Sequence, residues 1–195
     1  VTGSPIDASC QARADPIMRV RNQRAPESGT RPTLMKAALK RAPEAAIISI
    51  SSGRAWMQWA SGYRHDDAVR FTFQSEQDWE SRVAYQYAIT TDDAVIGSCG
   101  LMRRIGPGGL EIGYWLHPAY TGRGLATTAT AALVGQAFAL PDIDRVEIVH
   151  DQANTASGGI PRRLGFTEIQ RRTRAQGALA PGEIGIQVVW RLTRS

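Results

Sequence analysis

The segment Tyr120–Ala126, YTGRGLA, places two glycines and an arginine between a predicted strand and a predicted helix. Glycine lets the backbone approach a ligand closely, and the first N–H groups of a helix are free to bind an anion. Arg123 adds a side chain suited to phosphate. The spacing differs from the G-x-G-x-x-G of dinucleotide sites and lacks the G-K-[ST] of a P-loop. The sequence therefore predicts an anion-binding turn that is neither of these two nucleotide sites.

The turn is predicted to connect a strand to a helix. Leu110–Leu116 is apolar and reads as a strand, and after the turn Leu125, Ala129 and Leu133 recur at helical spacing until Pro141 ends the segment. The turn is therefore expected to form the N-terminus of the helix, where backbone N–H groups and the helix dipole both favour a pyrophosphate.

The rest of the chain alternates between the two kinds of element. Strands are predicted at 17–21, 83–90, 94–103, 110–116, 145–150, 166–172 and 184–191, and helices at 32–43, 76–82, 125–140 and 154–164. This order predicts a mixed α/β (α+β) fold, with a central, mostly antiparallel, twisted sheet of about six or seven strands flanked by helices. We expect residues 1–16 to be a disordered tail and 17–195 to be a single domain.

Composition narrows the class of protein. The net charge is +5 and rests almost entirely on scattered arginines, and no nucleic-acid-binding motif accompanies them, so nucleic-acid binding is kept only as an alternative. The wealth of Arg and Ala is typical of a GC-rich bacterial genome. No apolar stretch reaches the length of a membrane span, and the N-terminus lacks the apolar segment of a secretory signal. We expect a cytoplasmic protein without a membrane or metal site.

Three motifs together resemble the GNAT superfamily of N-acetyltransferases, and most closely its RimJ/RimL-like branch. Thr121–Ala126 is similar to the family's acyl-CoA loop, [QR]-x-x-G-x-[GA], with Thr in place of the first residue. The preceding LEIGYWLHPAY is similar to the branch's E-I-G-Y-W-L-x-P, and Asn154 and Ser157 with a later Leu-Gly-Phe match N-x-x-S and L-G-F. The resemblance covers about residues 83–172. Pro161 departs from it, because many members have a tyrosine there that protonates the leaving thiolate.

The resemblance implies acetyl-CoA as co-substrate, bound where the fourth and fifth strands, Glu111–Leu116 and Arg145–His150, splay apart. Backbone groups of the first of these strands would hold the pantetheine, and the turn would hold the pyrophosphate. The residues implied in cofactor binding are Trp115, Leu116, Gly122, Arg123, Gly124, Leu125, Ala126, Thr127 and Asn154.

Attack of an amine on a thioester needs a base and a donor near the departing sulfur. Glu111 is the preferred base, acting through water, and His150 is a second candidate. Ser157 is the candidate donor, since Pro161 supplies no hydroxyl. Each has a structural alternative: Glu111 can pair with an arginine across the sheet, Asn154 and Ser157 can serve the helix start, and His150 can be a packing residue.

The acceptor is the open question. Trp56 and Trp59 either line the acceptor cleft, as their position in the branch suggests, or bury one face of a helix. The predicted activity is transfer of an acetyl group from acetyl-CoA to a primary amine on a protein N-terminus, an antibiotic or a small metabolite. The alternative is a non-catalytic acyl-CoA-binding regulatory module. Dimers are frequent in the family, so a homodimer is an expectation left open.

Overall fold

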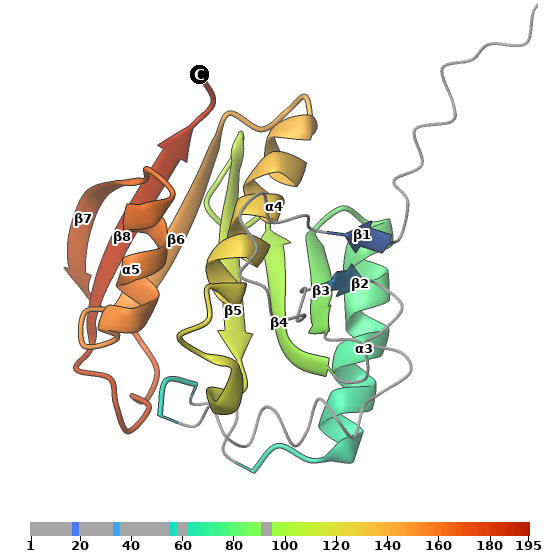
Figure 1. Ribbon diagram of the computed structural model, residues 1–195, viewed down its shortest axis with the longest axis horizontal. Coiled ribbons are helices and arrows are strands. Elements are labelled where there is room, and N and C mark those ends of the chain that lie inside the picture. Colours follow the sequence, from blue (N-terminus) through green and yellow to red (C-terminus); the bar gives the residue numbers. More distant parts are fainter. Residues whose placement is uncertain (1–16, 20–32, 36–54, 58–61, 91–94) are drawn as a thin grey trace, which may run out of the picture.

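The computed structural model describes residues 17–19, 33–35, 55–57, 62–90 and 95–195. They form one eight-stranded sheet of order β1-β2-β3-β4-β5-β6-β8-β7 (Figure 1). The strands are β1 (Ile17–Arg19), β2 (Thr33–Met35), β3 (Ala84–Thr90), β4 (Val95–Met102), β5 (Gly109–Leu116), β6 (Arg145–Asp151), β7 (Thr167–Thr173) and β8 (Ile186–Thr193). The helices are α3 (His65–Glu80), α4 (Leu125–Ala139) and α5 (Thr155–Arg163). The predicted mixed α/β fold is confirmed.

All neighbouring strands run antiparallel except β5 and β6, which are parallel. Their pairing begins at Gly109 with Arg145 and stops at Ile112 with Ile148. Beyond that point β5 stays paired with β4, and β6 stays paired with β8. The last residues of the two parallel strands therefore diverge, as Figure 1 shows, and the predicted splay is confirmed.

The apolar core lies on the face of the sheet that α4 covers. Leu110 and Ile112 of β5 are at most 1% exposed, and they pack with α4, whose Leu133 is fully buried. Because side chains alternate along a strand, Glu111, Gly113 and Trp115 lie on the opposite face. The helical spacing seen in the sequence thus marks the buried side of α4.

Two predicted helices are corrected. Residues 33–35 form strand β2, paired with Thr90 and its neighbours on β3, and the rest of the helix predicted at 32–43 lies outside the described residues. The short helix predicted at 76–82 is in fact α3, which begins at His65. It was missed because its only buried residues are Ala68 and Ser75, so the apolar stripe is too thin to read. The tail expected at 1–16 also lies outside the described residues, and the single domain stays a prediction.

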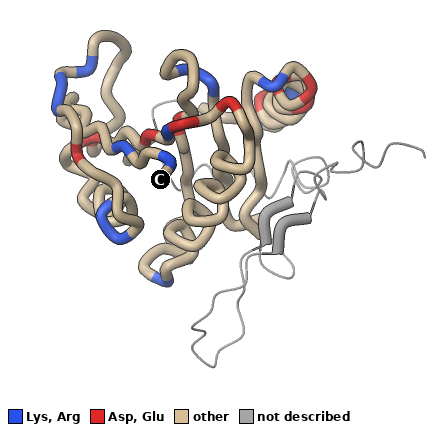
Figure 2. Tube along the Cα trace, turned by 90° about the horizontal axis from the view of Figure 1, so that it is seen from above, with Lys and Arg blue, Asp and Glu red and all other residues tan. Residues whose placement is uncertain are grey.

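Acidic and basic positions both recur along the described elements (Figure 2). Several arginines are paired: Arg103 with Asp142 at 2.7 Å, and Arg174 with Glu183 at 2.7 Å. Part of the positive charge of the arginines is therefore compensated in local ion pairs. Within the part of the chain that the structure describes, no helix has both the length and the apolar character needed to cross a membrane.

Candidate active site

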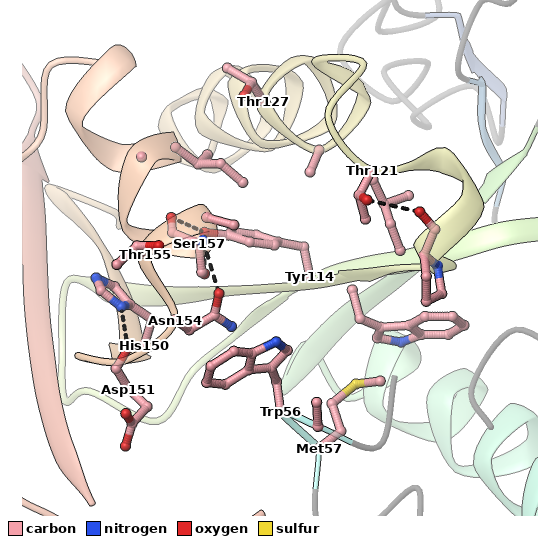
Figure 3. A pocket seen from close by; sticks show the side chains of 18 of the residues that line it. Trp56, Met57, Tyr114, Thr121, Thr127, His150, Asp151, Asn154, Thr155 and Ser157 are labelled. Carbon is pink, nitrogen blue, oxygen red and sulfur yellow. Dashed lines mark hydrogen bonds between the residues drawn. The ribbon is translucent and has the colours of Figure 1, made fainter. Parts of the chain in front are cut away.

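A cavity of about 1000 Å³ opens where β5 and β6 diverge (Figure 3). Its walls are the ends of these two strands, the first turns of α4 and α5, and the segment 55–57. The residues predicted from the sequence that line it are Trp56, Trp115, Leu116, Gly122, Gly124, Leu125, Ala126, Thr127, His150, Asn154 and Ser157. The splay thus brings together most of the predicted site. Glu111 and Arg123 are not among the lining residues, and Trp59 lies outside the described residues.

The glycine turn forms the start of α4, as predicted. Gly122 and Gly124 have φ of +73° and +77°, a region that L side chains rarely adopt, and Gly124 is the residue before the first turn of the helix. A Cβ at either position would meet no atom within 4 Å. No side chain caps α4. The turn therefore presents helix N–H groups to open space at the cavity, which is what a pyrophosphate needs.

The guanidinium of Arg163 lines the cavity beside the first turn of α4. It projects from the last turn of α5, and its Nη2 donates to Thr127 Oγ1 at 3.3 Å. Arg123, which the sequence favoured, is exposed and lies 5.5 Å over the Tyr120 ring. Sequence reasoning missed Arg163 because α5 meets α4 only in the folded chain.

Asn154 and Ser157 lie at the start of α5. The Asn154 Oδ1 accepts a hydrogen bond from the Ser157 backbone N–H at 3.1 Å, so Asn154 does cap the helix while it lines the cavity. The Ser157 Oγ lies 3.0 Å from the Oη of Tyr114, a residue of β5 that the sequence had not singled out. Burial raises the pKa of Tyr114 to about 12, despite the opposing influence of the hydrogen bond to Ser157. The phenol therefore keeps its proton at neutral pH.

His150 lies at the end of β6 with both ring nitrogens engaged. Trp190 Nε1–H donates to His150 Nε2 at 3.0 Å, which makes Nε2 an acceptor and leaves the ring proton on Nδ1. Nδ1 lies 2.7 Å from the backbone oxygen of Asp151. These bonds engage both ring nitrogens, so the geometry favours a structural role over that of a second base.

Glu111 lies outside the cavity, on the opposite face of β5 from Tyr114. Its carboxylate is ion-paired with the exposed guanidinium of Arg104, which is the alternative that the sequence had left open. Glu147 of β6 is the residue aligned with Glu111 of β5 in the sheet, and its carboxylate is ion-paired with Arg191 at 2.5 Å. The two adjacent carboxylates are thus each compensated by an arginine. Glu111 as the base stays a prediction.

The far side of the cavity joins two segments distant in the sequence. The Gly182 N–H donates to the Ala55 carbonyl at 2.8 Å, and a Cβ on Gly182 would lie 3.1 Å from the Trp56 ring. Trp56 is 38% exposed and lines the cavity together with Asn154 and Tyr114 (Figure 3). Arg174 and Glu183 of the β7–β8 loop also line this side. An aromatic side chain and a polar loop thus border this side of the cavity.

Asp151 fixes this loop to the end of β6. Its carboxylate accepts backbone hydrogen bonds from Ala153 at 2.9 Å, Gly185 at 2.8 Å and Ile184 at 3.2 Å. Burial, the largest single influence, raises the pKa of Asp151, but the backbone donors lower it, and the net pKa is lowered. A carboxyl with a lowered folded-state pKa stabilises the fold above its unfolded pKa of about 3.9, and the stabilisation disappears as the pH falls through the folded-state pKa.

We therefore expect Asp151→Asn to lower the melting temperature at pH 7, because the amide has one acceptor oxygen in place of two. The difference from the wild type should shrink as the pH falls below about 4, where the wild-type carboxyl is protonated in the unfolded and then in the folded chain. Thermal unfolding followed by circular dichroism between pH 3 and 7 measures this. A difference that stays constant with pH would contradict the assignment.

Among the described residues, no group of three or more His, Cys, Asp or Glu side chains is placed to hold a metal ion. What the site does offer is a strand fork, a glycine turn opening a helix, and two hydroxyls at the fork.

This fold is that of an acetyltransferase domain, and the family model of the GNAT acetyltransferase domain matches residues 33–167. The chain therefore belongs to the GNAT family, as its motifs predicted. Its relatives support the RimJ/RimL-like branch. The putative ribosomal N-acetyltransferase YdaF of Bacillus subtilis (strain 168) is 38% identical over 58 residues, which is 30% of this chain and 32% of YdaF. The match thus spans about a third of this curated relative.

Solved structures share the fold over a much greater length. The microcin C7 self-immunity acetyltransferase MccE, in complex with acetyl-CoA and AMP, superposes with a TM-score of 0.74 at 24% identity, over 84% of this chain and 92% of MccE. RimL, the ribosomal L7/L12 α-N-protein acetyltransferase in complex with coenzyme A, gives 0.72 at 19% identity, over 86% of this chain and 96% of RimL. At these identities the likeness concerns the fold.

Proposed function

We propose that this protein is an acetyl-CoA-dependent N-acetyltransferase that moves an acetyl group to a primary amine by direct attack on the thioester. The observation that carries the proposal is the continuity of one cavity. It joins the open glycine turn at the start of α4 to the paired hydroxyls of Tyr114 and Ser157 at the strand fork. The named relatives that bind acetyl-CoA or coenzyme A support the same co-substrate.

The residues present fit this co-substrate. The empty space beside Gly122 and Gly124 and the uncapped N–H groups of α4 suit a pyrophosphate, with Arg163 and Thr127 at hand for further phosphate contacts. The end of β5 that is no longer paired with β6, at Trp115 and Leu116, would hold the pantetheine arm through its backbone. The contacts with the cofactor that the sequence predicts are also proposed for four further residues: Arg123, Leu125, Ala126 and Asn154.

When bound, acetyl-CoA supplies the acyl carbon that the amine attacks, and its C–S bond breaks as the new C–N bond forms. Ser157 Oγ is the donor at the cavity wall suited to the sulfur that departs. Glu111 is proposed to take the amine proton through water from the opposite face of the sheet. Trp56 borders the acceptor side, and Trp59 is proposed with it from the sequence alone.

The acceptor class remains as broad as the family suggests: a protein N-terminus, an antibiotic or a small amine. RimL by name acts on a ribosomal protein, and MccE confers immunity to a microcin. The amine is the expected partner, with neither a membrane nor nucleic acid required by the reaction. A homodimer stays a prediction that light scattering would decide.

The test is release of free thiol from acetyl-CoA in the presence of peptides, aminoglycosides and amino acids. We expect thiol release with at least one amine, matched by an acetylated product in mass spectrometry. Because Pro161 replaces the tyrosine of many family members, the alternative function to be tested is that of a non-catalytic acyl-CoA-binding module. Coenzyme A binding without thiol release across the whole panel would favour that alternative.

A further inference from the structure

Tyr114 and Ser157 form a two-point contact inside the cavity, and both side chains line it (Figure 3). The Tyr114 Oη lies 3.0 Å from the Ser157 Oγ and donates to the Ser157 backbone carbonyl oxygen at 3.2 Å. One phenol from β5 therefore meets both oxygens of a single residue in the first turn of α5.

Pro161 explains why that carbonyl is available. In an α-helix the carbonyl of residue 157 would accept from the N–H of residue 161, but proline has none. Helix α5 nevertheless continues through Pro161 to Arg163. The Tyr114 phenol supplies the missing donor, and the Asn154 side chain satisfies the N–H of the same serine. Ser157 is thus held at its N–H, its carbonyl and its hydroxyl.

We propose that Tyr114 is a positioning residue that orients the Ser157 hydroxyl toward the thioester sulfur, an inference that rests on the proposed acetyltransferase function. The phenol has one proton and two acceptors within reach. When it donates to the carbonyl, it accepts the Ser157 hydroxyl proton. When it turns to the Ser157 Oγ, it leaves the hydroxyl proton free to point into the cavity.

The proton balance follows from this arrangement. As the C–N bond forms and the C–S bond breaks, the nitrogen must lose one proton and the sulfur must gain one. The Ser157 hydroxyl gives its proton to the sulfur, and it is reprotonated through water by the proton that Glu111 takes from the amine nitrogen. Tyr114 keeps its own proton, because burial raises the pKa of this phenol to about 12, far above that of a thiol. Tyr114 therefore supplies a hydrogen bond and no net proton.

The kinetic test is a double-mutant cycle of Tyr114→Phe and Ser157→Ala. Tyr114→Phe keeps the ring and should lower kcat about tenfold, the worth of one hydrogen bond to a catalytic group, with the KM for acetyl-CoA unchanged. In the Ser157→Ala background the same change should have no further effect on kcat. Tyr85→Phe, in a tyrosine of β3 that does not line the cavity, is the matched control and should keep the wild-type kcat. Equal losses from Tyr114→Phe in both backgrounds, or a raised KM with unchanged kcat, would overturn the proposal.

A second cycle needs no activity. Pro161→Ala restores a helical N–H to the Ser157 carbonyl, so Tyr114→Phe should lower the melting temperature less in the Pro161→Ala background than in the wild type. Equal losses would show that the phenol does not serve the carbonyl and would overturn the proposal. Absence of acetyl transfer by the wild type, with this thermal coupling intact, would instead refute the proposed function, and the two failures are thereby distinguished.

Discussion

Gly124→Val should weaken coenzyme A binding by about a hundredfold or more while the protein stays folded. Gly124 has φ of +77°, lines the cavity and precedes the first turn of α4, so its backbone is part of the surface offered to the pyrophosphate. A β-branched side chain costs roughly 1–2 kcal/mol in this conformation and also fills the space in which a Cβ now meets no atom. Loss of two charge-assisted hydrogen bonds, at about 1.5 kcal/mol each, gives the expected factor. Calorimetric titration with coenzyme A measures it.

Gly165→Val is the matched control for this change. Gly165 follows α5, has φ of +78° and likewise has no atom within 4 Å of its Cβ position, but it does not line the cavity. The two variants should therefore lose similar thermal stability, and only Gly124→Val should lose affinity. Undiminished affinity in Gly124→Val, or an equal loss in both variants, would remove the turn from the coenzyme A site.

The parts of the site that depend on local sequence could be predicted. The start of α4 follows from two glycines next to an apolar helical repeat, and the Asn154 cap follows from an N-x-x-S at the start of α5. Both are set within one turn of helix, where the residue types themselves determine the backbone. Strands β3 to β8 were equally accessible, because their apolar or alternating runs are bounded by turns.

The parts that depend on packing between distant elements could not be predicted. The Tyr114–Ser157 contact joins residues 43 apart, and the Trp190–His150 bond joins residues 40 apart. The first arises only once α5 packs beside β5, and the second only once β6 and β8 pair in the sheet. Strand β2 shows the same limit, because its pairing with β3 overrides a sequence that reads as helical. For the Tyr114–Ser157 contact, the sequence offered one indication, Pro161. A proline in a helix leaves one backbone carbonyl without its helical N–H donor, so another group must supply it.

Glu111→Gln should lower kcat about a hundredfold near neutral pH, with recovery as the pH rises toward the pKa of the amine. The carboxylate lies three residues before Tyr114, about 10 Å along the strand, so it would act through water and not by direct contact. At high pH the amine is neutral without help, which is why the variant should recover. Steady-state kinetics between pH 6 and 10 measures both effects.

The variant Arg104→Gln distinguishes a role of Glu111 as the base from a role of Glu111 in the ion pair with Arg104. It breaks the same pair from the exposed end, since the Arg104 side chain is 58% exposed and that of Glu111 only 12%. If Glu111 is the base, Arg104→Gln should keep kcat within a few fold while Glu111→Gln does not. If the carboxylate only pairs with Arg104, both variants should leave kcat unaltered at every pH. A lasting difference in kcat between two variants that lose the same ion pair can come only from the carboxylate itself, so the comparison decides between the two roles that the sequence left open for Glu111.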